Sequence, residues 1–167
     1  MFGKLPPWNP AAARPWLALV AGLVAFDQLT KQLVVDRFLY GESLALLPVL
    51  DLTRLHNTGA AFSLLADQAG WQRWLFSTVA AAVAVALGVV LLRLERATPR
   101  LLAASYALIM AGALGNLIDR LRQGYVVDFV HVHWNDWYYP AFNVADSAIT
   151  IGAVLLIYDA IRAPTKS

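Results

Sequence analysis

Long apolar stretches dominate the pattern of hydrophobic and polar positions along this chain. Two of them contain no charged residue, namely WLFSTVAAAVAVALGVVLL at 74–92 and LLAASYALIMAGALGNLI at 101–118. Each is close to the roughly 20 residues that a helix needs to cross about 30 Å of hydrocarbon. Two more stretches are equally apolar but contain charge, WLALVAGLVAFDQLTKQLVV at 16–35 and AFNVADSAITIGAVLLIY at 141–158. The pattern therefore predicts four transmembrane helices around a membrane all-α core.

The segments between these stretches follow a different pattern. Residues 51–56 alternate as a half-buried strand does, and Asn-Thr-Gly at 57–59 supplies a turn after them. Residues 126–134 alternate in the same way within a segment dense in aromatic side chains. We expect a small sheet and an interfacial segment on one face of the membrane.

The chain shows no internal repeat or long linker, so we expect a single integral membrane domain over 1–167. Its spans are predicted at about 16–35, 72–92, 101–119 and 141–160, joined by longer segments at 36–71 and 120–140.

Basic residues next to the spans predict the orientation, because segments rich in Lys and Arg stay in the cytoplasm. They flank the first span, fill the short link between the second and third, and follow the fourth: Lys4, Arg14, Arg93, Arg96, Arg100, Arg162 and Lys166. Both termini are therefore predicted in the cytoplasm, and 36–71 and 120–140 face outward. A cleaved signal peptide is an alternative for the first span, but charge interrupts it and no A-x-A-like cleavage site follows.

The amino-acid composition limits the kinds of catalysis that this chain can carry out. The chain is 59% hydrophobic and 14% charged, and its net charge of +2 reflects sidedness rather than a surface for nucleic acid. It has no cysteine, which excludes disulfides, thiol nucleophiles and thiolate-bound zinc. Any catalysis must use carboxylates, histidines, serines or lysines.

Charged residues within the spans are the first candidates. Asp27 and Lys31 are four residues apart and share a helix face, so they predict an internal ion pair or a supporting role beside a site. Asn116 and Arg120 also share a face, at the outward end of the third span. They either offer an amide and a guanidinium to a bound peptide backbone or form a polar helix end among lipid headgroups.

Two further patterns indicate other chemistry. His131 and His133 fall on one face of a strand, but a catalytic metal needs a third ligand that the sequence does not supply. A serine and lysine dyad would use Lys31 with Ser63 or Ser147, although Asp27 is already the expected partner of the lysine.

Asp128 and Asp146 belong at one depth, near the outer membrane interface. A carboxylate there loses hydration, and a second carboxylate close by raises one pKa of the pair further, so that the two share a proton. Such a pair suits an aspartic peptidase, in which one carboxylate activates water and the other protonates the substrate. The other interpretation is a lone intramembrane carboxylate at 146 and a loop acid at 128.

Five motifs occur in order around these residues: FDQLTK at 26–31, NTGAAFS at 57–63, GNLIDR at 115–120, VVDF at 126–129 and FNVADS at 142–147. Together they resemble the bacterial lipoprotein signal peptidases, also called signal peptidase II, over nearly the whole chain. The resemblance implies an aspartic endopeptidase of the bacterial inner membrane, with its active site at the outer face. It would cleave the signal peptide from diacylglyceryl-modified prolipoproteins just before the lipidated cysteine.

The resemblance also implies roles for individual residues. Asp128 and Asp146 would be the catalytic pair. The residues implied to bind substrate are Asn57, Gly59, Asn116, Arg120 and Asn143, and those implied to support the site are Asp27, Lys31 and Asp119. The family has an outward-facing β-cradle after the first span and uses no metal, so no cofactor is expected. Its implied partners are lipidated prolipoproteins, membrane lipids and globomycin-type peptide inhibitors.

Two other classes remain open from the residues alone. A small proton-coupled transporter or channel subunit would use Asp27, Asp119 and Asp146 as a relay. An assembly factor would need neither Asp128 nor Asp146.

Overall fold

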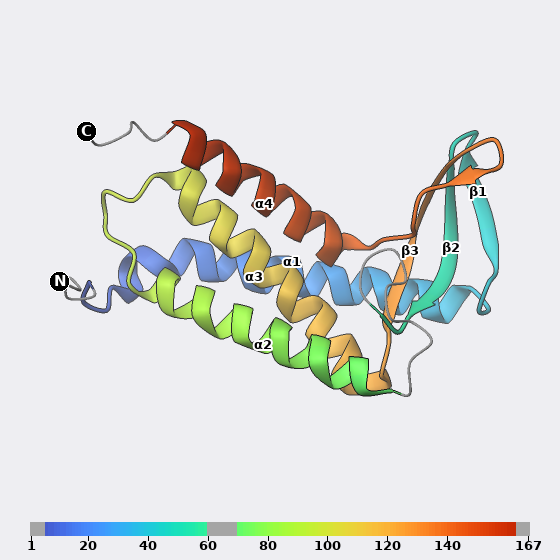
Figure 1. The fold of residues 1–167 in the computed structure, drawn as a ribbon, viewed down its shortest axis with the longest axis horizontal. Coiled ribbons are helices and arrows are strands. Elements are labelled where there is room, and N and C mark those ends of the chain that lie inside the picture. Colours follow the sequence, from blue (N-terminus) through green and yellow to red (C-terminus); the bar gives the residue numbers. More distant parts are fainter. Residues whose placement is uncertain (1–5, 60–69, 163–167) are drawn as a thin grey trace.

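A computed structural model of the chain describes residues 6–59 and 70–162. Within these ranges, four helices are long and apolar enough to cross a membrane: α1 (Pro10–Arg37), α2 (Trp71–Leu92), α3 (Arg100–Gln123) and α4 (Val144–Arg162). They lie side by side as a bundle, and α1 begins at the same end of the bundle as α4 ends (Figure 1). The prediction of four membrane-spanning helices is confirmed.

A small antiparallel sheet lies at the other end of the bundle (Figure 1). Its strands are β1 (Ser43–Leu47), β2 (Leu50–Asn57), β3 (Val126–Trp134) and β4 (Trp137–Tyr138), paired in the order β1-β2-β3-β4. The alternation at 126–134 therefore predicted β3 correctly. The sheet joins two segments far apart in the chain, because Leu55 of β2 lies opposite Asp128 of β3.

The helix ends differ from the predicted spans for local reasons. The first helix starts at Pro10 because the Asn9 side chain accepts a hydrogen bond from the Ala12 N–H, and proline suits the first helical position. The third helix continues to Gln123 and stops at Gly124, whose φ of 89° few other residues adopt readily. The fourth starts only at Val144, because Phe142 still exchanges backbone hydrogen bonds with Val130.

The third helix is the centre of the bundle and contacts each of the other three. Small side chains bring the helices close together, since Ala103, Ala107 and Ala111 are buried along it. One apolar cluster, around Val20 and Leu91, fills the bundle near the start of α1. A second cluster joins α1 to the sheet.

That second cluster consists of Val34 near the end of α1 with Val127 and Phe129 of β3. All three side chains are buried. Because Val127 and Phe129 flank Asp128 in the sequence, their packing fixes the strand on which this carboxylate lies.

Gly112 allows the closest approach between α3 and α4. A Cβ at this position would clash with the carbonyl oxygen of Ala145 and lie 2.6 Å from Cγ1 of Ile149. We expect Gly112→Ala to lower the free energy of unfolding by about 1–3 kcal/mol, measured by reversible unfolding in detergent. Gly22→Ala is the matched control, because nothing lies within 4 Å of its added Cβ. Equal stability changes in the two variants would contradict close packing at Gly112.

Candidate active site

Asp146 lies in the first turn of α4, where it takes part in the N-terminal cap of that helix. The side-chain oxygen of Asn143 accepts a hydrogen bond from the Asp146 N–H at 2.9 Å. In return, Oδ2 of Asp146 accepts from the Asn143 N–H at 3.3 Å. This reciprocal pattern is a capping box, and it holds the Asp146 carboxylate at the positive end of the helix.

Asp128 approaches the same place from the sheet. Its side chain is only 2% exposed, and its two oxygens accept hydrogen bonds from the side-chain amides of Asn143, at 2.6 Å, and Asn57, at 3.0 Å. Asn143 therefore contacts both carboxyl groups, through Nδ2 to Asp128 and through its backbone N–H to Asp146. The structure thus brings together the two aspartates that the sequence proposed as a pair.

Backbone donors fix the orientation of two of the asparagine amides. Oδ1 of Asn57 accepts from the Gly59 N–H at 3.0 Å, and Oδ1 of Asn143 accepts from the Asp146 N–H. Because these partners can only donate, each amide must direct its NH2 group toward Asp128. A third amide, that of Asn116, donates to Oδ1 of Asp146 at 2.7 Å.

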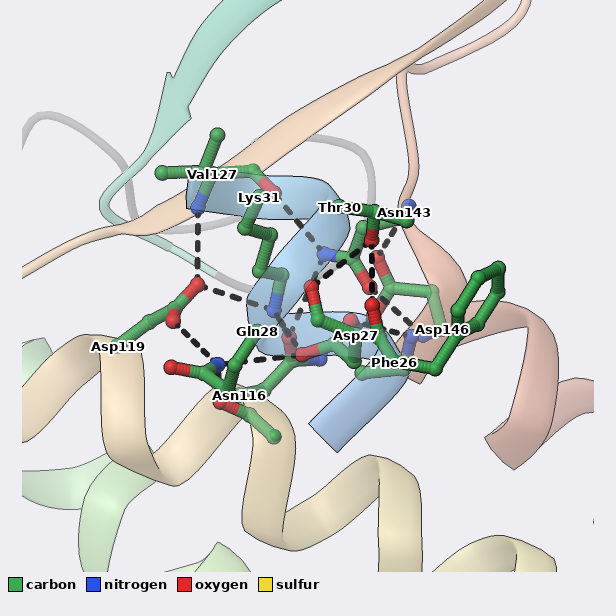
Figure 2. Close-up of polar contacts among 12 residues, drawn as sticks. Phe26, Asp27, Gln28, Thr30, Lys31, Asn116, Asp119, Val127, Asn143 and Asp146 are labelled. Atoms are coloured by element: carbon green, nitrogen blue, oxygen red, sulfur yellow. Dashed lines mark hydrogen bonds and ion pairs between the residues drawn. The ribbon is translucent and has the colours of Figure 1, made fainter. Parts of the chain in front are cut away.

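Lys31 is the centre of a buried polar network that reaches Asp146 through Asn116 (Figure 2). Its ammonium group lies 2.9 Å from Asp27 and 3.0 Å from Asp119, so the predicted ion pair with Asp27 is confirmed and Asp119 is a second acidic partner. It also donates to Oδ1 of Asn116 at 3.0 Å. The network links α1 and α3.

Two members of this network have contacts that the sequence did not predict. Asp27 accepts a hydrogen bond from the Ala145 N–H at 2.9 Å, so a side chain of α1 caps α4. The Gln28 amide donates to Asp119 at 2.8 Å and to Asp27 at 3.2 Å. The only signal for Gln28 was its position inside the FDQLTK motif.

Arg120 is 8% exposed, which excludes the interpretation as a polar helix end among lipid headgroups. Its guanidinium donates to the Gly59 carbonyl at 3.0 Å and the Asn116 carbonyl at 3.4 Å. It also lies 5.4 Å from the centroid of the Phe76 ring, within the range of a cation–π contact. Arg120 therefore joins α2 and α3 to the turn after β2.

The structure does not support a dyad of Lys31 with Ser147. The Ser147 hydroxyl donates to the Asn143 carbonyl at 2.9 Å, while the three hydrogens of Lys31 have Asp27, Asp119 and Asn116 as acceptors. Ser63 lies outside the described residues.

His131 and His133 lie on β3 beyond Asp128. The His133 ring is 3.4 Å from the Asp51 carboxylate, and both histidine rings lie against Tyr138. Among residues 6–59 and 70–162, no group of three His, Asp or Glu side chains is placed to hold a metal ion.

A cavity of about 730 Å³ opens beside Asp146. Asn57, Asn116, Arg120 and Asp146 form its polar side. Apolar residues of α2, α3 and α4 form much of the remaining wall: Phe76, Val79, Ala80, Val83, Ile109, Ala113, Ile149 and Ile151. The cavity therefore offers a polar end and an apolar body, as ligand sites commonly do.

Burial raises the pKa of Asp128 to about 7, and the nearby charge of Asp146 adds to the shift, against hydrogen bonds from Asn57 and Asn143 and the charge of Lys31. An unfolded aspartate titrates near pH 3.9, so between about pH 4 and 7 the folded state binds more protons than the unfolded state. The contribution of Asp128 to the free energy of unfolding therefore falls as the pH rises through this window.

Asp128→Asn removes this dependence, because an amide does not titrate. We expect the variant to gain a few kcal/mol of stability relative to wild type between about pH 4 and 7, with no further gain above that range. Denaturant unfolding of both proteins across this range measures the difference, in which the titrating groups that do not interact with Asp128 cancel. A difference that is constant with pH would contradict the raised pKa of Asp128.

The bundle and the paired carboxylates are those expected of a membrane aspartic peptidase. The family described as signal peptidase (SPase) II matches this chain over residues 19–162, and the chain belongs to that family. The lipoprotein signal peptidase of Burkholderia mallei (strain SAVP1) is 50% identical over 162 residues, which are 97% of this chain and 96% of the relative. That of Paraburkholderia phymatum is 49% identical over 148 residues, covering 89% of this chain and 88% of the relative.

The fold is also similar to solved structures of bacterial membrane enzymes. A bacterial membrane enzyme structure obtained by the in meso method at 2.3 Å resolution is 28% identical, with a TM-score of 0.80 over 99% of this chain and 96% of that one. A second such structure, at 1.9 Å, has a TM-score of 0.76 and the same identity, and covers 96% of this chain and 99% of its own. The chain is thus a multi-pass membrane aspartic peptidase, and a proton-coupled transporter is not favoured.

Proposed function

We propose that this chain removes signal peptides from diacylglyceryl-modified prolipoproteins by cutting just before the lipidated cysteine, and that Asp128 and Asp146 are its catalytic pair. The observation that carries this proposal is that Asn143 binds both carboxyl groups, and that one of them, Asp146, lines the cavity. An aspartic peptidase uses two carboxyl groups that come from different parts of the fold and are held in place by hydrogen bonds, as Asp128 and Asp146 are here.

The proposed reaction needs one proton between the two carboxyl groups. One carboxylate takes a proton from water as the water oxygen attacks the peptide carbonyl, while the other carboxyl group protonates the carbonyl oxygen. As the intermediate breaks down, the first group passes its proton to the leaving amine and the second takes back a proton from the hydroxyl group of the intermediate. A pKa of about 7 for Asp128 supports a pair that still holds one proton near neutral pH. Because the two groups are coupled, the measured pKa values belong to the pair.

The cavity suits a peptide with a lipid attached. Asn57, Asn116 and Arg120 line its polar side, where they can hold an extended backbone, with Gly59 behind Arg120 and Asn143 between the aspartates. The apolar wall between α2 and α4 suits the signal helix and acyl chains of a substrate in the bilayer. Globomycin-type peptide inhibitors would compete for this cavity.

Asp27, Lys31 and Asp119 support the site from behind rather than line the cavity. We place the protein in the bacterial inner membrane, with both termini in the cytoplasm and the sheet and the aspartates at the outer face. The basic residues Arg93, Arg96 and Arg100 between α2 and α3, at the end opposite the sheet, support this orientation. Holding the pair at the outer interface lets it reach a scissile bond that the lipid keeps at the membrane surface.

The test is cleavage by the full chain, reconstituted in lipid vesicles, of a diacylglyceryl-modified prolipoprotein beside its unlipidated twin. Cleavage before the cysteine of the lipidated form alone, blocked by a globomycin-type peptide, is the expected result. Equal cleavage of both forms would refute the lipid dependence, and an uncut lipidated precursor with folded protein would refute the proposed function.

A further inference from the structure

The amide of Asn116 can only be oriented in one way, and Lys31 is the reason. An ammonium group donates three hydrogen bonds and accepts none, so the Asn116 atom that lies 3.0 Å from Nζ of Lys31 must be the oxygen. The NH2 group must then face Oδ1 of Asp146, at 2.7 Å. Figure 2 shows these side chains close together, with Lys31 from α1, Asn116 from α3 and Asp146 from α4.

Asn116 differs in this respect from the other two asparagines that bind the aspartates. Backbone N–H groups orient Asn57 and Asn143, and no side-chain substitution removes them. The other donor to the Asn116 oxygen is the Asn143 amide, at 3.3 Å, which lies closer to Asp128, at 2.6 Å. The orientation of Asn116 therefore depends mainly on Lys31.

Loss of this orientation would change Asp146 directly. With the amide turned over, the Asn116 oxygen would face Oδ1 of Asp146, and two acceptors at that distance require a proton between them. A protonated Asp146 cannot take a proton from water. We propose that Lys31 is a positioning residue which, through Asn116, keeps Asp146 as the unprotonated carboxylate that activates water, leaving Asp128 as the proton donor.

This inference rests on the proposed function and is tested by a double-mutant cycle with the full chain and the lipidated prolipoprotein. We expect Lys31→Met to lower kcat on the order of 10²-fold, comparable to the loss of one oriented donor in other enzymes. KM should change by less than about threefold, because Lys31 does not line the cavity. In an Asn116→Ala background, Lys31→Met should lower kcat by less than about threefold more, since the group it positions is absent.

Gln28→Met is the matched control for a structural effect. It removes the hydrogen bonds of Gln28 to Asp27 and Asp119 in the same network but leaves Lys31 on Asn116. We expect its kcat to stay within about threefold of wild type. A loss like that of Lys31→Met would assign Lys31 a purely structural role and refute the inference.

If Lys31→Met does not fold, the cycle uses Lys31→Met combined with Asp119→Asn, which removes one charge of each sign from the network. Losses of Lys31 and Asn116 that multiply in the double variant would refute the inference alone, with the proposed function intact. A wild-type protein that does not cleave the lipidated precursor would refute both.

Discussion

Asp128→Asn and Asp146→Asn are each expected to lower kcat/KM for the lipidated prolipoprotein by about 10³-fold or more, the upper part of the range for general acid–base catalysis. An amide keeps the size of the side chain but can neither take the proton of the attacking water nor return one to the leaving amine. Each replacement leaves a single carboxyl group, which cannot carry out both steps.

Asp136→Asn is the matched control for these two variants. Asp136 is exposed in the turn between β3 and β4, on the segment between α3 and α4 that also carries Asp128. The kcat/KM of the Asp136→Asn variant should remain within about twofold of the wild-type value. Turnover retained by either Asp128→Asn or Asp146→Asn would exclude the catalytic pair.

Folding must be measured separately in these variants. Both oxygens of Asp128 accept amide N–H groups, from Asn57 and Asn143, and an asparagine offers only one such acceptor. One donor then loses its partner, at a cost of about 1–3 kcal/mol. Near-ultraviolet circular dichroism and the thermal midpoint distinguish this loss of stability from the loss of chemistry.

The helices and the main strands could be predicted because their signals are local. Uninterrupted apolar stretches predict membrane spans, and alternation at 126–134 predicts β3. The start of α4 could not be predicted in this way. The helix begins at Val144 because Phe142 pairs with Val130 across the sheet, and the apolar pattern does not contain that contact.

The pair of aspartates was predictable for a similar reason. Polar groups within apolar segments are conspicuous, and the five motifs placed them in one family. Their geometry was not predictable, because it depends on contacts between residues distant in the chain. Asp27 caps α4 through Ala145, and Lys31 orients Asn116, while the sequence spacing alone indicated only the pairing of Asp27 with Lys31.

Asp27→Ala is expected to lower the free energy of unfolding by about 3–5 kcal/mol, the usual cost of breaking a buried ion pair. Asp27 is 1% exposed. Its carboxylate forms an ion pair with the Lys31 ammonium at 2.9 Å and accepts a hydrogen bond from the Ala145 N–H at 2.9 Å. Alanine leaves Lys31 with one acid instead of two and leaves the Ala145 N–H without an acceptor. Reversible unfolding in detergent micelles measures the loss.

Two further variants separate the contributions to this effect. Asp36→Ala removes an exposed acid of the same helix, one that accepts a hydrogen bond from Gln32, and should change stability by no more than about 0.5 kcal/mol. Asp27→Asn keeps an oxygen for the Ala145 N–H but loses the charge, so its stability should lie between wild type and alanine. If Asp27→Ala were as stable as Asp36→Ala, the carboxylate would not hold α1 against α4. Because α4 also carries Asp146 three residues after Asn143, the first residue of its cap, such a result would further mean that the position of the Asp146 carboxylate depends on α3 and the sheet alone.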